Sequence, residues 1–261
     1  MYKRIVCLTT ETVEVLYALG EQDRIVGISG YTTRPAIARK EKPKVSAFTT
    51  AKIDKILALQ PDLVLGFSNL QADIAAALIK SGVEVHVFNQ RSVDEILRMI
   101  LTTGLLVGTL DKAQRLVHTL RQQIELIRKT ASKMTRKPIV YFEEWDEPMM
   151  CSIRWAAELI AIAGGQDCFP ELIKQHSAAN RIVTPAQVLT RMPDIIIGSW
   201  CGKRFQPEVV AAREGWHAIP AIKNGFVREI KSADILQPGP SVITHGLVQL
   251  TRIIQEWQET Q

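Results

Sequence analysis

The segment "TLDKAQRLVHTLRQQIELIRKTASKM" (Thr109–Met134) is the longest uninterrupted helical pattern in this chain. Its apolar residues recur at helical spacing, and nothing in the segment breaks a helix. At 1.5 Å per residue, such a helix is about 35 Å long, which spans a whole domain. We therefore predict a rigid helix that joins two lobes, because a flexible linker would have a different composition.

The sequences on either side of this helix repeat each other loosely. Each opens with a strand and a helix, "RIVCLT" with "ETVEVLYALG" and "KPIVYFE" with "IRWAAELIAIAGG", and glycines end both helices. Further on, "IDKILALQPDLVLGF" (Ile53–Phe67) parallels "PAQVLTRMPDIIIGSW" (Pro185–Trp200), and "GVEVHVFN" parallels "GFVREIKS". The consecutive apolar residues are typical of strands buried on both faces of a parallel sheet.

The predicted fold class is therefore α/β, with two Rossmann-like lobes of parallel sheet joined by one long helix. The expected boundaries are an N-terminal lobe at 1–108, the connecting helix at 109–134 and a C-terminal lobe at 135–261. Two such lobes in tandem predict a ligand cleft between them, since clefts between domains are favoured binding sites.

Composition excludes several classes of function. The chain has 261 residues, of which 46% are hydrophobic and 23% charged, and a net charge of +5, which suits a soluble globular protein. The basic residues are dispersed and no nucleic-acid-binding motif accompanies them, so a nucleic-acid partner is not expected. No C-x-x-C pair and no long apolar run occur, which argues against a structural zinc site and a membrane span.

The N-terminus leaves the compartment open. "MYKRIVCLTT" enters a strand almost at once, without a signal-peptide pattern. As written, the chain is expected in the cytoplasm. It is expected in the periplasm or outside the cell if a leader has been replaced by a cloning methionine.

The stretch "YFEEWDEPMM" (Tyr141–Met150) places acids and a tryptophan after a predicted strand. Strand ends are where ligands bind in α/β proteins. Neighbouring strand residues face opposite ways, so only one of Glu143 and Glu144 points inward. Trp145 and Asp146 are expected to begin the loop that follows the strand. A glycosidase pair or a metal site would need partners that the sequence does not supply. We favour Trp145 as a cleft wall, with Glu144 accepting hydrogen bonds from ligand amides or from Arg154; a solvated acidic loop is the alternative.

The whole chain resembles a known family. The opening "RIVCLTTETVEVLYALGEQDRIVGISGYTTRP" and the block "KIDKILALQPDLVLGF" resemble the helical-backbone class of ABC-transporter substrate-binding proteins, which handle vitamin B12, haem and ferric siderophores. "FEEWDEPMMCSIRWAAELIAIAGG" and "GWHAIPAIKNGFVREIKSADILQPGPSV" resemble the second lobe of its cobalamin-binding branch. This resemblance implies two lobes with little hinge motion.

The resemblance and the pattern together nominate ligand-facing residues. Tyr31 matches a family tyrosine that lines the cleft, and Phe67 matches an aromatic that faces the ligand. Trp200 holds the corresponding place in the second lobe. Thr10 and Glu11 lie where the first strand turns into the first helix, and they either cap the helix or also face the ligand.

The remaining candidates come from the second lobe. Arg154 either pairs with Glu144 or neutralises an anionic group of the ligand. Cys201 is a soft metal ligand in principle, although a buried free thiol is the favoured interpretation. Asp234 and Gln237, in "ADILQPGPS", could bond the ligand's polar arms. The five histidines are dispersed and are interpreted as structural.

The family docks on its permease through one acid at the tip of each lobe. The matching positions here are Asp73, six residues after Phe67, and Glu208, eight after Trp200. The family acid is usually glutamate, so Asp73 departs from the pattern and leaves room for a binding protein that serves no transporter.

These features predict a monomeric, non-catalytic binding protein for a corrinoid, with cobalamin as the expected ligand, no catalytic cofactor and no metal site of its own. It would be the substrate-binding component of an ABC-type uptake system. A haem or ferric-siderophore binding protein of the same fold is the first alternative. A cytoplasmic corrinoid-related enzyme using Glu143, Glu144 or Cys201 is the second, although no nucleophile–base pair or cofactor fingerprint is present. A scaffold with a vestigial cleft is the third.

Overall fold

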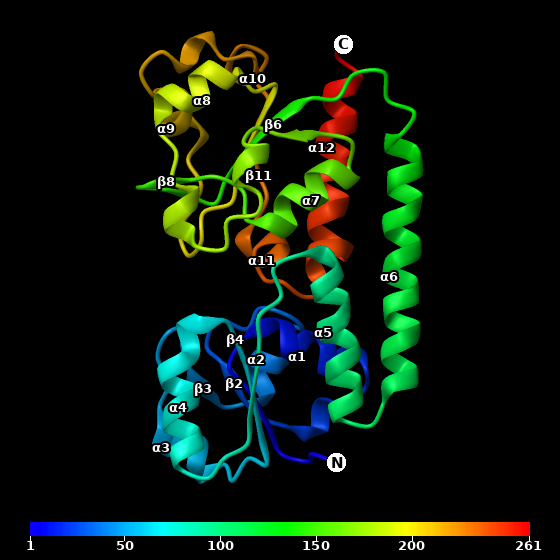
Figure 1. Ribbon diagram of the computed structural model, residues 1–261, viewed down its shortest axis with the longest axis vertical. Helices are drawn as coiled ribbons and strands as arrows, with labels where there is room; N and C mark the ends of the chain where they lie inside the picture. The colour runs from blue at the N-terminus through cyan, green and yellow to red at the C-terminus, as the bar shows by residue number, and fades with distance from the viewer. The chain divides into compact units, whose positions relative to one another are not determined.

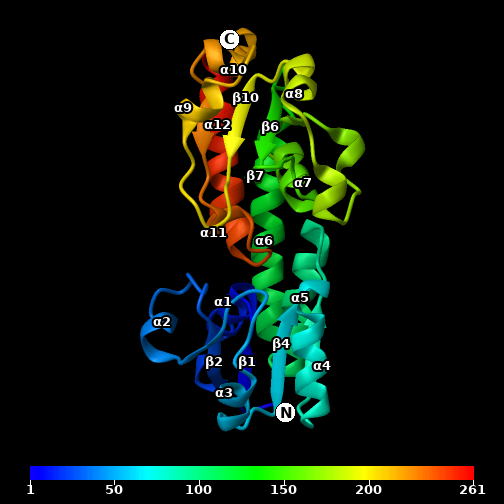
Figure 2. The ribbon, with the colours of Figure 1, turned by 90° about the vertical axis from the view of Figure 1, so that its left-hand side faces the viewer.

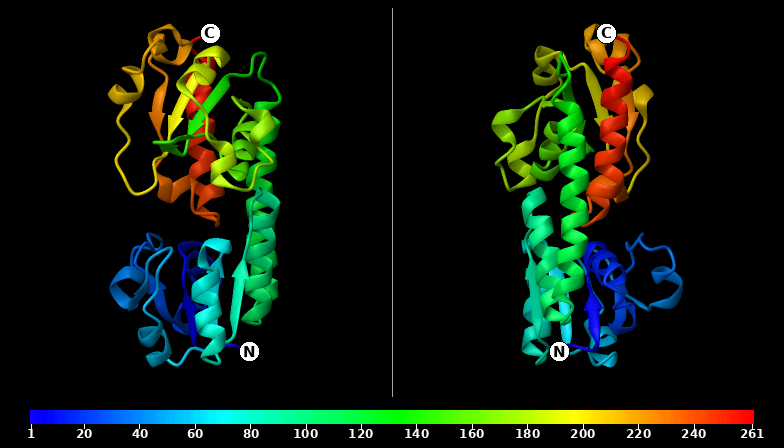
Figure 3. Two further views of the ribbon diagram at one scale, coloured as in Figure 1. Left: turned by 60° about the vertical axis from the view of Figure 1, so that its left-hand side comes forward. Right: turned by 90° about the vertical axis from the view of Figure 1, so that its right-hand side faces the viewer.

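A computed structural model describes all 261 residues, and the chain divides into two compact units. Unit 1 comprises Met1–Gln90 and Asp94–Thr119, and unit 2 comprises Arg91–Val93 and Leu120–Gln261. Helix α6 (Leu110–Ala131) crosses from one unit into the other as 22 uninterrupted residues (Figures 1 and 3). The long helix predicted from the sequence is therefore confirmed.

Unit 1 is built on a five-stranded sheet with the order β3-β2-β1-β4-β5, in which every neighbouring pair is parallel. All five residues of β4 are buried, as the apolar run "LVLGF" predicts for a strand covered on both faces. Its strands are β1 Ile5–Cys7, β2 Ile25–Ser29, β3 Lys44–Ser46, β4 Leu63–Phe67 and β5 Val85–Phe88. Its helices are α1 Thr10–Ala18, η1 Gln22–Arg24, α2 Ala38–Glu41, α3 Ile53–Ala58, η2 Asn69–Gln71, α4 Ala72–Lys80 and α5 Val93–Leu106.

Unit 2 contains a four-stranded parallel sheet with the order β11-β10-β6-β9 and a separate antiparallel hairpin, β7-β8. In Figure 2 the arrows of β6 and β10 run side by side in one direction. The strands are β6 Ile139–Glu143, β7 Trp145–Asp146, β8 Met149–Met150, β9 Gln166–Asp167, β10 Ile195–Gly198 and β11 Val227–Glu229. The helices are α7 Arg154–Ile162, η3 Pro170–Leu172, η4 Ala178–Arg181, α8 Pro185–Arg191, α9 Pro207–Ala211, η5 Trp216–Ala218, α10 Pro220–Lys223, α11 Ser232–Ile235, the π-helical η6 Val242–Leu247 and α12 Val248–Gln258.

The two sheets repeat one topology. In each sheet, the first strand pairs with the strand that ends the similar sequence block. In unit 1, β1 pairs with β4, and in unit 2, β6 pairs with β10. The next strand along the chain, β5 or β11, then extends the same side of the sheet. The parallel between the two halves of the sequence is therefore a parallel between two folded units.

Local signals in the sequence explain where several helices begin and end. Thr184 and Gln187 form a capping box at the start of α8, each side chain bonding the other's backbone N–H. Gly164 follows α7 with a φ of +99°, which favours glycine because it has no Cβ. No helix of the structure is both long enough and apolar enough to cross a membrane.

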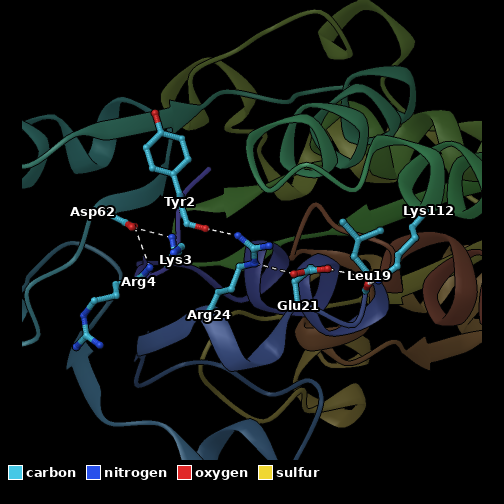
Figure 4. Close-up of polar contacts among 8 residues, drawn as sticks. All are labelled: Tyr2, Lys3, Arg4, Leu19, Glu21, Arg24, Asp62 and Lys112. Carbon is cyan, nitrogen blue, oxygen red and sulfur yellow. Dashed lines mark hydrogen bonds and ion pairs between the residues drawn. The ribbon is translucent and has the colours of Figure 1, made fainter.

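Polar contacts hold the amino-terminal edge of the sheet in unit 1 (Figure 4). The carboxylate of Asp62, just before β4, accepts hydrogen bonds from the backbone N–H of Lys3 at 2.7 Å and of Arg4 at 2.9 Å. Lys112, on α6, donates to the Leu19 carbonyl oxygen at 2.9 Å, which ties the end of α1 to the long helix. These contacts lie at the amino-terminal ends of the strands, whereas the candidate site lies at their carboxyl-terminal ends.

Candidate functional site

The sheet order of unit 1 changes direction between β1 and β4. Strands β2 and β3 lie on one side of β1, whereas β4 and β5 lie on the other. In open parallel sheets, ligands bind outside the carboxyl ends of the two strands that flank such a switch point. Thr10 and Glu11 follow β1 and Phe67 is the last residue of β4, so three of the predicted residues lie at this point.

Thr10 and Tyr31 are connected at this edge. Thr10 Oγ1 donates a hydrogen bond to the carbonyl oxygen of Tyr31 at 3.1 Å, and the Tyr31 N–H donates to Ser29 Oγ at 3.2 Å. The backbone of Tyr31 is thereby fixed while the residue stays 61% exposed. An exposed tyrosine on an ordered turn offers an aromatic face and a hydroxyl to a ligand.

Glu11 lies in the first turn of α1 and is only 3% exposed. Its Oε1 has no hydrogen-bond partner. Burial raises the pKa of the carboxyl to about 7, and the nearby backbone N–H of Glu11 and hydroxyl of Thr9 offset only part of this effect. A buried acceptor without a donor is rare in folded proteins and needs a reason.

Phe67 ends β4 and is 6% exposed, so its ring is mostly covered. The buried amide of Gln71 holds this turn: its Oε1 accepts from the Phe67 N–H at 2.9 Å and its Nε2 donates to the Phe48 carbonyl oxygen at 2.8 Å. A Cβ at Gly66 would lie 2.9 Å from Gln71 Oε1, which explains the glycine in "LVLGF". Phe67 therefore shapes the turn more than it presents a surface.

Unit 2 has its own switch point, between β6 and β10. The segments that follow these strands contain Glu144, Trp145, Trp200 and Cys201, so four more predicted residues gather at one sheet edge. A Cβ at Gly198, the last residue of β10, would lie 1.8 Å from Cε2 of Phe205. This glycine lets the loop after β10 fold back over the end of its own strand.

Glu143 is fully buried and accepts four hydrogen bonds. Arg213 donates to Oε2 at 2.6 Å and to Oε1 at 2.9 Å. Trp200 Nε1 donates to Oε1 at 3.0 Å, and the Tyr141 hydroxyl donates to Oε2 at 2.9 Å. Burial raises the pKa of Tyr141 well above its ordinary value, so the phenol keeps the proton that it donates. Glu143 is therefore the acid of the strand that points inward. It links β6 to Trp200 and Arg213 through hydrogen bonds.

Glu144 and Arg154 do not pair with each other, which corrects one of the two interpretations offered for Arg154. Arg181 NH1 donates to Glu144 Oε2 at 2.6 Å and also to the Cys151 carbonyl oxygen at 2.6 Å. Arg154 Nε instead bonds Glu158 Oε1 at 2.9 Å, one helical turn along α7. Residues four apart on a helix are neighbours, so Glu158 lies within reach of Arg154.

Trp145 and Asp146 were expected to begin a loop, but they form strand β7, which pairs with Met149 and Met150. The hairpin holds Trp145 half-buried, and its Nε1 donates to the Glu147 carbonyl oxygen at 2.7 Å. Local backbone pairing across a short turn orders this residue, which is the physical reason that the loop interpretation was wrong.

Trp200 and Cys201 lie differently from their expected positions. Trp200 is 4% exposed and packs edge-on against Phe205, with ring centroids 5.0 Å apart. Its ring is therefore buried beneath the surface of the site and does not face solvent. Cys201 was interpreted as a buried thiol, but it is exposed because it lies in a turn that leaves the sheet.

The last ligand candidates follow β11. Asp234 lies on α11, and its Oδ2 accepts from Gln249 Nε2 at 2.9 Å. Gln237 follows two residues after the helix ends, and both side chains are half-buried. They lie at the carboxyl edge of the same sheet as the switch-point residues.

The two docking candidates occupy equivalent places. Asp73 is the second residue of α4, which follows β4, and Glu208 is the second residue of α9, which follows β10. Both are exposed. An acid in the first turn of a helix is favoured by the helix dipole, so each is stable as an exposed anion.

The potential metal ligands of the chain are dispersed, and three of its four cysteines are buried. No three His, Cys, Asp or Glu side chains come together as a metal site. Cys7, Cys151 and Cys168 are buried, and burial raises the pKa of each thiol to about 12, which leaves them unreactive as nucleophiles.

Comparison with known proteins agrees with this architecture. The profile of a family described as periplasmic binding protein matches residues 5–233. The chain belongs to the periplasmic binding protein family. A vitamin B12-binding protein of Vibrio parahaemolyticus is 23% identical over 245 residues, which cover 92% of this chain and 86% of that protein. An uncharacterized ABC transporter substrate-binding lipoprotein of Bacillus subtilis is 26% identical over 265 residues, covering 97% and 80%.

Among solved structures, a periplasmic heme-binding protein from Roseiflexus is similar, with a TM-score of 0.84, 21% identity and coverage of 99% of this chain and 100% of that one. This likeness shows the fold. This periplasmic binding protein therefore has two lobes, each with a parallel sheet, as its sequence predicts.

Several important side chains of the site were not predicted. Arg181, Arg213 and Lys203 complete the ion pairs at the edge of unit 2. Arg181 and Arg213 lie far along the chain from their acids, so no local spacing could have found them. Lys203, three residues after Trp200 in "SWCGK", was close enough to have been considered.

Proposed function

We propose that this periplasmic binding protein is a non-catalytic binding protein for a corrinoid, cobalamin being the expected ligand, within an ABC-type uptake system. Family membership and relatives that are named vitamin B12-binding proteins support the proposal. The observation that carries it is the buried, unpartnered Oε1 of Glu11 at the switch point of unit 1.

The chemistry of the ligand's arms makes Glu11 informative. A corrinoid carries carboxamide arms, whose N–H groups donate hydrogen bonds. The arms of haem and the oxygens of a ferric siderophore are anionic acceptors. Above its raised pKa of about 7, the ionised carboxylate of Glu11 accepts hydrogen bonds from the former and repels the latter, because like charges repel. Glu11 therefore favours a corrinoid.

The aromatic candidates suit a large, flat ring. Tyr31 is exposed on its turn, and Trp145 is half-buried on its hairpin. Aromatic faces bury flat apolar rings at roughly 25 cal/mol per Å². Each unit thus offers an aromatic residue near its own switch point.

The acids of unit 2 argue against a catalytic role. Glu143 pairs with Arg213, Glu144 with Arg181 and Asp146 with Lys203. A general acid or base must reach the proton that it transfers, and these carboxylates are held by cations. Binding, without turnover, is the function that remains supported.

Trp145→Ala is expected to weaken cyanocobalamin binding by about 30-fold or more, the effect of losing an aromatic anchor. Trp145→Phe, which keeps an aromatic face, is expected to retain most of the affinity. Calorimetric titration with cyanocobalamin, cobinamide, haem and a ferric siderophore tests both variants against the wild type. Equal affinity of the alanine variant and the wild type would contradict a ligand-facing Trp145, and tight binding of haem alone would contradict the corrinoid proposal.

The proposed partner is a permease, which Asp73 and Glu208 would contact through arginines. Asp73→Lys and Glu208→Lys are each expected to reduce corrinoid uptake by about tenfold, since like charges disfavour the encounter. The affinity for cyanocobalamin is expected to stay unchanged. Uptake of labelled cyanocobalamin by cells that depend on this protein measures the effect. Glu125→Lys, an exposed acid on α6, is the control, and an equal loss with it would refute specific docking.

The proposed place of action is outside the cytoplasmic membrane, as for relatives that are named periplasmic proteins or lipoproteins. There the protein would capture the corrinoid and deliver it to the permease.

A further inference from the structure

Lys203 lies in the loop between β10 and α9, and its ammonium meets three groups. Nζ lies 4.5 Å from the ring centroid of Trp145 and 4.9 Å from that of Trp200. It also forms an ion pair with Asp146 Oδ1. The side chain is nevertheless 39% exposed. The cation is therefore oriented by two indole faces and one carboxylate while it keeps access to solvent.

The ammonium of Lys203 retains hydrogen-bonding capacity. An ammonium has three N–H donors, and the π faces attract its charge without accepting a conventional hydrogen bond. Asp146 is its one carboxylate partner. Lys203 can consequently donate to oxygens of a ligand without leaving the aromatic faces.

The loop between β10 and α9 carries two cations, Lys203 and Arg204, and no acid of its own. The acids Glu143, Glu144 and Asp146 are each matched by one cation, Arg213, Arg181 and Lys203 respectively. The next residue, Arg204, is exposed and forms no ion pair. Glu147, exposed in the turn between β7 and β8, balances the total charge. Two adjacent cations in the loop, one of them over a half-buried indole, still favour an anionic group on the ligand.

We propose that Lys203 and Arg204 form a subsite for an anionic oxygen group of the ligand, next to the face of Trp145. This inference rests on the proposed ligand-binding function. In a cobalamin the matching group is the phosphodiester of the nucleotide loop; in a haem it is a carboxylate. Lys203 donates as a point charge and Arg204 as a planar fork. The subsite makes the protein select complete cobalamins over cobinamide, which lacks the phosphodiester.

The experiment separates anion recognition from a merely structural role of Lys203. The dissociation constants of cyanocobalamin and cobinamide are measured for the wild type and for Lys203→Met and Arg204→Met. If Lys203 only orients Trp145, its loss weakens both ligands equally. If it contacts the phosphodiester, its loss weakens cyanocobalamin alone. We expect Lys203→Met to lower cyanocobalamin affinity about fivefold to tenfold, the effect of a partly exposed charged hydrogen bond.

Two further variants serve as controls. Lys203→Arg keeps the charge and is expected to retain most of the discrimination between the two corrinoids. Lys223→Met removes an exposed lysine that precedes β11, at the amino-terminal end of that strand, and is expected to change neither affinity. Higher salt is expected to weaken cyanocobalamin more than cobinamide in the wild type, and Lys203→Met is expected to reduce that difference.

The results distinguish this inference from the proposed function. Corrinoid binding with the same affinity ratio in wild type and Lys203→Met overturns the subsite and leaves the corrinoid function standing. Binding of haem without corrinoids overturns the corrinoid function; the subsite is then supported if Lys203→Met weakens haem but not its dimethyl ester, and overturned if both respond alike. If the wild type binds none of cyanocobalamin, cobinamide, haem and a ferric siderophore, both the subsite and the proposed function are overturned.

Discussion

Arg213→Met is expected to lower the free energy of unfolding by about 3–5 kcal/mol, because it leaves a buried carboxylate without its cation. Glu143 is fully buried and Arg213 is 14% exposed, so solvent screens this pair little. Methionine keeps apolar contact with Trp216, over whose ring the guanidinium lies at 4.7 Å. Urea unfolding followed by tryptophan fluorescence measures the loss.

The matched control is an exposed pair on α6. Arg128 and Glu125 are 55% and 65% exposed, and Arg128→Met is expected to change stability by less than about 1 kcal/mol. The double variant Glu143→Leu with Arg213→Met is expected to recover part of the loss, since it removes both buried charges. Equal small effects of Arg213→Met and Arg128→Met would contradict the account of the Glu143 network.

Glu11→Gln is expected to stabilise the protein at pH 8 but not at pH 4. Burial raises the pKa of Glu11 from an ordinary 4.5 to about 7 in the folded protein. The unfolded chain therefore loses this proton at lower pH than the folded chain, and stability falls as pH rises from about 4.5 to about 7. At about 1.4 kcal/mol per pKa unit, the full destabilisation above pH 7 is about 3 kcal/mol.

Glutamine keeps the shape of Glu11 and cannot ionise, so the variant escapes this loss. Unfolding free energies of wild type and Glu11→Gln, measured from pH 4 to pH 8, are expected to diverge across that window. Glu41→Gln, at an exposed acid of α2, is the control and is expected to leave the pH profile unchanged. A constant difference between wild type and Glu11→Gln across the range would refute a raised pKa at Glu11.

The same carboxyl predicts pH-dependent ligand binding. An amide N–H of the ligand bonds best to the ionised carboxylate, so binding favours loss of the proton. Cyanocobalamin affinity is expected to rise about tenfold from pH 6 to pH 8 in the wild type. Glu11→Gln is expected to abolish this rise. A pH-independent affinity in the wild type would show that Glu11 does not meet the ligand.

The architecture was predictable because its signals are local. The helical spacing of Thr109–Met134 needs no tertiary information, and α6 forms where it was expected. The apolar runs "LVLGF" and "IIIG" also form the buried strands β4 and β10, one in each parallel sheet. Each run is recognisable from its own residues alone. The order of the strands, and with it the two switch points, was not predicted, because strand pairing depends on contacts between distant parts of the chain.

The polar contacts of the site were not predictable because they join distant parts of the chain. Arg213 reaches Glu143 across 70 residues, and Arg181 reaches Glu144 across 37. Trp200 was expected to face a ligand, but a long-range hydrogen bond to Glu143 and packing against Phe205 bury it. Hydrophobic periodicity predicts which segments are buried, but it does not predict which cation pairs with which acid.

Competition among candidate ligands tests the central claim most directly. The wild-type protein is incubated with equal amounts of cyanocobalamin, haem and a ferric siderophore, and native mass spectrometry identifies the species that it retains. We expect a one-to-one complex with the corrinoid. Retention of haem or siderophore in its place, or of none of the three, would contradict the account.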